Sequence, residues 1–183
     1  MHLRFLADQV PTLEEIRLRD IRPCAMTALK DRACADCRGD LILCHDNESC
    51  VKDADLIATC TSGDEQIIRP DWFKRGAFGV GIEGGCAYTA EALHQADKFI
   101  VDDVALAEYF DKIGRARLTA EGQPDPEFPG GMPPIYATIG EIVVGKKPGR
   151  DSDQERIVAI PIGIRRRSRS SSPSTRWPSA TSW

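Results

Sequence analysis

Hydroxyl and acidic side chains follow two short apolar runs near the middle of the chain. The first run, residues 55–60, is followed by Thr61 and Ser62, and the second, residues 76–82, is followed by Glu83 and two glycines. Short apolar runs of this kind are typical of strands buried on both faces of a parallel sheet. Such sheets bind ligands at the carboxyl ends of their strands. The two runs therefore predict a ligand crevice lined by small, hydroxylated and acidic residues.

The rest of the chain alternates between extended and helical patterns. Further strands are predicted at residues 15–20, 40–44, 98–103 and 156–160. Helices are predicted at residues 1–10, 23–37, 47–53 (with Asn47 as N-cap), 89–93, 104–113 and 115–120. Residues 139–144 fit either pattern, and residues 122–134 are predicted to form a loop. This alternation predicts an α/β fold of the Rossmann-like type, a mostly parallel sheet with helices on both faces.

One acidic residue, Asp20, ends the first predicted strand. In dinucleotide-binding sheets such an acid binds the ribose hydroxyls, and it lies about 20 residues beyond the glycine-rich phosphate loop. Counting back by that spacing from Asp20 reaches Met1. We therefore expect residues 1–164 to form a partial Rossmann domain that lacks its first strand and its glycine-rich loop.

Residues 165–183 have a different composition from the rest of the chain. They are rich in Ser, Arg and Pro, which cannot form a packed core, so we expect a disordered basic tail. The tail is either an interaction arm or the product of a reading-frame shift after Ile164. We prefer the second interpretation, because the composition changes abruptly at that residue.

Charge and cysteine content narrow the class of protein. The formal net charge is −4 although the tail alone carries five arginines, so the remaining body is strongly acidic and is not expected to bind nucleic acid. We find no apolar run of the roughly 20 residues that a membrane span needs, and no secretory leader. Seven scattered cysteines favour free thiols in the cytoplasm. A single CxxC at residues 34–37 is not expected to hold a metal.

The run from Gly140 to Asp153, GEIVVGKKPGRDSD, is the most specific motif of the chain. It resembles the E-x-x-x-G-x-x-x-G-R-x-S-D run of the ornithine cyclodeaminase/μ-crystallin family. Weaker matches follow in the family's order at residues 54–61, 70–72, 76–81 and 91–102. The resemblance covers residues 3–164, and it extends to the family's tyramine oxidase subgroup through Gly84-Gly85 and Tyr88-Thr89. It implies a homodimeric fold whose dimer platform is absent from this chain.

The resemblance also implies roles for individual residues. Glu83 corresponds to the family's catalytic Asp, and the extra methylene displaces its carboxylate, so ornithine need not be the substrate. Asp20 would bind the adenosine ribose and favour NAD, although Arg22 keeps NADP open. The remaining residues expected to contact the cofactor are Thr59, Thr61, Ser62, Val80 and Gly81. The family's Asp-Ser step is absent here, because Ile160-Pro161 stands in its place.

By resemblance, the activity is NAD-dependent and its substrate is an amino acid or amine. Hydride transfer would give an imine, and ammonia would be released, as in an ammonia lyase or an imine or amino-acid oxidoreductase. We expect this chain to be a truncated fragment that is inactive by itself and binds NAD only in the millimolar range. The alternative is a non-catalytic Rossmann-like binding or accessory protein, similar to μ-crystallin or to members of the tyramine oxidase subgroup.

Overall fold

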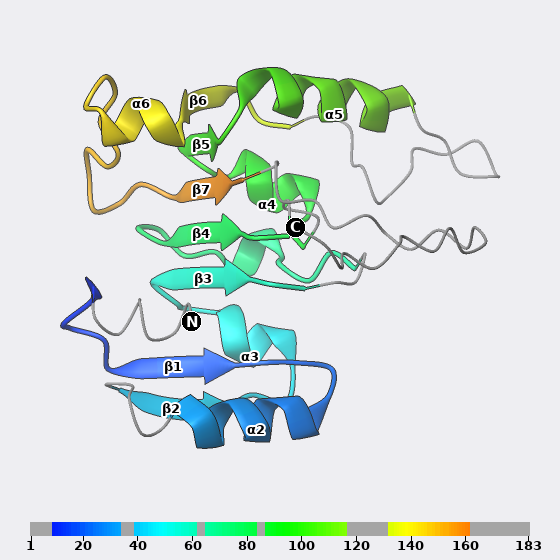
Figure 1. Ribbon diagram of the computed structural model, residues 1–183, viewed down its shortest axis with the longest axis vertical. Helices are drawn as coiled ribbons and strands as arrows, with labels where there is room; N and C mark the ends of the chain where they lie inside the picture. Colours follow the sequence, from blue (N-terminus) through cyan, green and yellow to red (C-terminus); the bar gives the residue numbers. More distant parts are fainter. Residues whose placement is uncertain (1–8, 34–38, 62–64, 84–86, 117–131, 162–183) are drawn as a thin grey trace, which may run out of the picture.

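The computed structural model describes residues 9–33, 39–61, 65–83, 87–116 and 132–161 (Figure 1). Strands and helices alternate along it, as the sequence predicts. Their order is β1 (Glu15–Leu18), α2 (Pro23–Ala33), β2 (Asp40–Leu43), α3 (Asn47–Val51), β3 (Leu56–Thr59), the 3₁₀ turn η1 (Pro70–Trp72), β4 (Phe78–Gly81), α4 (Ala90–His94), β5 (Lys98–Val101), α5 (Val104–Ala116), β6 (Ile135–Thr138), α6 (Ile139–Val143) and β7 (Ile157–Ile160).

The strands form two parallel sheets. The larger sheet has five strands in the order β3-β4-β7-β5-β6, and the smaller one pairs β1 with β2. All four residues are buried in both β5 and β7, which explains why these strands read as continuous apolar runs. The fold is therefore the Rossmann-like, mostly parallel α/β arrangement that the sequence predicts.

Apolar side chains pack on both faces of the five-stranded sheet. On one face, Val51 of α3, Leu93 of α4 and Ala107 of α5 cover a cluster that contains Ile57 and Val158. On the other face, Ile142 of α6 packs against a smaller cluster of Ile100, Ile157 and Ala159 from β5 and β7. Helices thus cover both faces, and the two clusters hold the central strands in place.

The two-stranded sheet is connected to the larger one through α3. Arg17 of β1 donates hydrogen bonds to the carbonyl oxygens of Ser49 (3.4 Å) and Lys52 (2.7 Å), at the end of that helix. Among the described strands no ladder joins β1 to β3, although both point the same way in Figure 1. The predicted lack of a first strand stays a prediction.

Three local expectations differ from the structure. Asp46, and not Asn47, caps α3, because its carboxylate accepts from Ser49 N at 2.7 Å. Strand β6 lies just after the predicted loop and was not expected. Helix α5 runs without interruption through Gly114. The CxxC at 34–37, most of the helix at 1–10 and the tail at 165–183 lie outside the described residues.

A buried lysine fixes the amino end of β5. The Lys98 side chain is only 6% exposed, and its Nζ lies 2.6 Å from Asp151 Oδ2 and 3.2 Å from Glu155 Oε2. Burial opposes the charge, but the two carboxylates leave the pKa of Lys98 raised. The backbone N–H of Asp151, followed by Lys98, lowers the pKa of Glu155. The run that carries the family motif is thereby attached to the core.

Replacement of this lysine tests that attachment. Lys98→Met keeps the aliphatic stem and removes the ammonium, so we expect a loss of about 2 kcal/mol in the free energy of unfolding near pH 7. Because the pKa of Lys98 is raised in the folded chain, its contribution is present below about pH 10 and is lost as the pH rises through the folded pKa. Because the pKa of Glu155 is lowered, its contribution is present above about pH 4 and is lost on acidification through the folded value.

Lys74→Met is the matched control for a urea titration at several pH values. Lys74 Nζ lies 2.7 Å from Asp55 Oδ1, but the Asp55 side chain is 93% exposed. Exposed pairs contribute about 0–1 kcal/mol, so this variant should unfold at nearly the wild-type midpoint. Equal losses in the two variants would contradict a special role for Lys98.

Candidate functional site

The predicted site residues follow strands that end on the same side of the molecule. Each sheet is parallel, and the arrows of β1, β3 and β4 point in one direction in Figure 1. Asp20 follows β1, Thr61 follows β3 and Glu83 follows β4. The carboxyl ends of these strands therefore present the three residues to one edge, as expected for a ligand crevice.

A short hydrogen bond joins β3 and β4 at this edge. Thr59, the last residue of β3, is buried, and its hydroxyl donates to Glu83 Oε1 at 2.6 Å. The ladder continues one residue past β4, because Ile82 N donates to Thr59 O at 3.0 Å. Glu83 therefore leaves the strand at a fixed place. Its second oxygen, Oε2, is buried and has no hydrogen-bond partner among the described residues.

The other residues predicted to contact a cofactor surround this pair. Val80 and Gly81 end β4, and they lie opposite Ala58 and Thr59 in the register. The Thr61 hydroxyl is buried, again without a partner among the described residues. The structure thus brings Thr59, Thr61, Val80, Gly81 and Glu83 together. Ser62 lies outside the described residues.

Asp20 stands apart from this group, on the two-stranded sheet. Its Oδ1 accepts from the backbone N of Arg22 at 2.8 Å and from Arg22 Nε at 3.4 Å. The backbone hydrogen bond, followed by the guanidinium, lowers the pKa of Asp20 and keeps the carboxylate charged. Its side chain is still 39% exposed, so a ligand can reach it.

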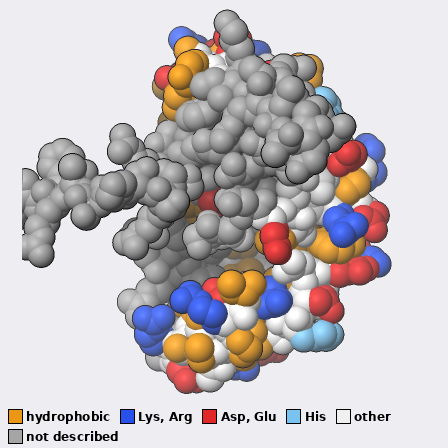
Figure 2. Space-filling model, turned by 90° about the vertical axis from the view of Figure 1, so that its right-hand side faces the viewer, with side chains coloured by type: hydrophobic (Ala, Val, Ile, Leu, Met, Phe, Trp, Pro, Cys, Tyr) orange, Lys and Arg blue, Asp and Glu red, His pale blue; other side chains and the backbone are white. Residues whose placement is uncertain are grey.

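Positive side chains lie close to Asp20. Arg19 and Arg22 flank it on the connection from β1 to α2, and the guanidinium of Arg19 donates to Asp20 O. Figure 2 looks onto the carboxyl ends of the strands, and it shows Lys and Arg side chains gathered on the lower part, where Figure 1 places β1, β2 and α2. Cations beside a lone carboxylate suit a ligand that has both hydroxyl and anionic groups.

Sequence reasoning assigned no role in this site to Tyr88. The residue is completely buried, and burial followed by the nearby charge of Glu83 raises its pKa well above the usual value. The same two causes raise the pKa of the accessible Cys60 thiol. Both shifts place Tyr88 and Cys60 within the electrostatic field of Glu83. No spacing in the sequence indicates that proximity.

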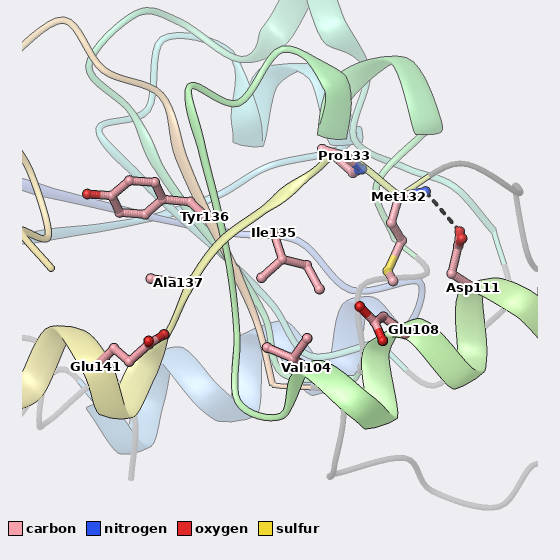
Figure 3. Close-up of a pocket in the computed structure, with 9 residues that line it drawn as sticks. All are labelled: Val104, Glu108, Asp111, Met132, Pro133, Ile135, Tyr136, Ala137 and Glu141. Carbon is pink, nitrogen blue, oxygen red and sulfur yellow. Dashed lines mark hydrogen bonds between the residues drawn. The ribbon is translucent and has the colours of Figure 1, made fainter. Parts of the chain in front are cut away.

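A separate pocket of about 350 Å³ lies at the opposite edge of the sheet, between α5, β6 and α6 (Figure 3). Two of its three carboxylates already have backbone partners. Asp111 Oδ1 accepts from Met132 N at 3.0 Å, and Glu141 Oε2 accepts from Thr138 N at 2.9 Å in a capping box. Those partners hold the pocket wall in place, and the candidate site is therefore assigned to Thr59 and Glu83.

The described part of the chain offers neither a metal site nor a membrane span. Within those residues, no group of three or more His, Cys, Asp or Glu side chains could hold a metal ion. None of the described helices has the length and apolar character needed to cross a bilayer.

The arrangement fits a nucleotide with a ribose beside the strand ends. Thr61 Oγ1 and Glu83 Oε2 are buried polar atoms without partners among the described residues, and a ligand hydroxyl or amine could satisfy them. Gly81 leaves the backbone of β4 open to a flat ring. Asp20 is positioned for a second ribose. These residues could therefore hold a dinucleotide cofactor.

Comparisons with known proteins identify the family and its curated members. The profile described as "Ornithine cyclodeaminase/mu-crystallin family" matches residues 1–164. The N-((2S)-2-amino-2-carboxyethyl)-L-glutamate dehydrogenase of Staphylococcus aureus is 30% identical over 125 residues, which are 68% of this chain and 35% of that protein. The alanine dehydrogenase of Archaeoglobus fulgidus is 30% identical over 114 residues, 60% of this chain and 33% of that protein. The chain thus spans about a third of the length of these relatives.

Solved structures show the same fold. An archaeal alanine dehydrogenase dimer with bound NAD superposes with a TM-score of 0.62 at 21% identity, over 84% of this chain and 46% of that one. The family profile covers the two sheets and the run from Gly140 to Asp153 alike. This chain belongs to the ornithine cyclodeaminase/μ-crystallin family.

Proposed function

We propose that the chain is the nucleotide-binding part of a NAD-dependent enzyme that acts on an amino acid or amine. The observation that supports this best is the hydrogen bond from Thr59 to Glu83, which fixes a carboxylate across the ends of two neighbouring parallel strands. The names of the two curated relatives, both dehydrogenases of amino acids, also support it. Because the chain spans only part of those proteins, the activity is proposed for the whole protein to which this part corresponds.

Each residue of the site has a proposed role. Asp20 binds the adenosine ribose, Thr59, Thr61 and Ser62 lie beside the nicotinamide ribose, and Val80 and Gly81 contact the ring. When bound, NAD supplies the hydride acceptor that converts the amine into an imine. Glu83 acts as general base, taking a proton at Oε2 from an amine or water while Thr59 holds Oε1. Ammonia leaves after attack on the imine.

Binding of NAD tests the first part of the proposal. We expect a Kd in the millimolar range, measured by saturation-transfer NMR, because the sequence predicts no phosphate loop ahead of Asp20. Asp20→Ala should weaken NAD binding by about tenfold, through the loss of hydrogen bonds to a charged acceptor. The same change should narrow the preference for NAD over NADP, since it removes the charge that repels a 2′-phosphate and frees Arg22.

Asp40→Ala is the control, because Asp40 is an exposed acid at the opposite, amino end of β2. Equal NAD affinity in the two variants would reject the role of Asp20. Micromolar binding together with turnover of ornithine would reject the partial-domain interpretation. NAD binding by the whole protein without any amino-acid turnover would favour the non-catalytic binding or accessory protein.

A chemical probe tests the placement of Glu83 without any cofactor. Burial and then the charge of Glu83 raise the pKa of Cys60, so Glu83→Gln should increase the thiolate fraction. We expect iodoacetamide to alkylate Cys60 at least about twofold faster at pH 8 in this variant. Peptide mass spectrometry follows Cys60, and the exposed Cys24 on α2 is the internal reference. An unchanged ratio of the two rates would contradict the site geometry.

A further inference from the structure

Tyr88 lies directly behind the candidate acid. It is 0% exposed, and a short parallel bridge to Ile68 holds its backbone. Its ring lies against Gly79 of β4, where an added Cβ would come within 2.7 Å of Tyr88 Oη. A side chain at Gly79 would therefore occupy the space of the hydroxyl. The glycine lets a long phenol reach the layer beneath the strand ends.

The Tyr88 hydroxyl is unusual for a side chain packed in a core. It is buried without a hydrogen-bond partner among the described residues, which is costly, and a phenylalanine would fill the same apolar space. Two other buried polar atoms in the same state, Thr61 Oγ1 and Glu83 Oε2, follow β3 and β4. The unsatisfied atoms therefore gather at the candidate site, where a bound ligand or a small adjustment can pair them.

Thr59 connects the phenol with the carboxylate. Its hydroxyl donates its single proton to Glu83 Oε1 at 2.6 Å, and the carbonyl oxygen of Val80, at 3.4 Å, is the competing acceptor. The oxygen of Thr59 still has lone pairs for a donor. Burial raises the pKa of Tyr88, the charge of Glu83 raises it further, and the neighbouring Thr59 hydroxyl acts the other way. Tyr88 thus stays a neutral donor close to Thr59.

We propose that Tyr88 is a positioning residue whose hydroxyl donates to Thr59 Oγ1 and thereby directs the Thr59 proton to Glu83. This inference rests on the role of Glu83 in the proposed function. With the Thr59 hydroxyl held from behind, its rotation toward Val80 is disfavoured. Glu83 Oε1 is then fixed, and Oε2 faces the place where a substrate amine or water would lose its proton. Tyr88 itself touches neither substrate nor cofactor.

The test measures the pH profile of Cys60 alkylation in Tyr88→Phe. Without the donor, the hold of Thr59 on Glu83 weakens and the carboxylate turns toward solvent, away from Cys60. We expect Cys60 to react about twofold faster than wild type at pH 8, in the direction of Glu83→Gln. Tyr136→Phe is the matched control, because its hydroxyl donates to Pro148 O at 3.2 Å on the far edge strand. That control should leave the rate at Cys60 unchanged.

A second variant keeps the result independent of one substitution. Gly79→Ala displaces the Tyr88 hydroxyl sterically, so it should accelerate Cys60 as Tyr88→Phe does, while Cys24 keeps its rate. Acceleration in Glu83→Gln with none in Tyr88→Phe overturns the inference. No acceleration in either also overturns it, because Glu83 would then not lie near Cys60. None of these measurements uses NAD, so a failure of NAD binding rejects the proposed function separately.

Discussion

The candidate site depends on the parallel register between β3 and β4. Pairing of Ala58 with Val80 and of Thr59 with Gly81 ends both strands at the same level, so a residue two positions beyond β4 comes back to the last residue of β3. The 2.6 Å hydrogen bond between Thr59 and Glu83 is the result. A slip of one residue in this register would turn Thr59 to the other face of the sheet and separate the pair.

Much of the fold could be predicted from the sequence because local patterns determine it. Runs of apolar residues identified β3, β5 and β7, and Thr89 is the N-cap of α4 as its position suggests. Strand β6 was missed because its four residues directly follow a stretch rich in Gly and Pro. Its identity depends on pairing with β5, from Phe99 with Ile135 to Val101 with Thr138. Pairing between segments more than 30 residues apart leaves no local mark.

The same limit applies to the candidate site. The acidic and hydroxyl residues after β3 and β4 could be found, since the strand ends are visible in the sequence. The contact of Tyr88 with Gly79 and the burial of Lys98 between Asp151 and Glu155 could not be found, because each joins segments that only the folded chain brings together. Gly79 reads as an ordinary small residue in an apolar run. In the structure, its missing side chain decides where a phenol ends.

The separate pairing of the two sheets has a consequence for handling the protein. Among the described strands, β3 has a neighbour on one side only, and so does β1. Leu56 of β3 and Ile42 of β2 are also 38% and 41% exposed. Open main-chain edges beside apolar side chains favour edge-to-edge association between molecules. Concentrated samples will therefore tend to aggregate through strand addition, and dilute, low-temperature storage suits this chain better than crystallisation-scale concentrations.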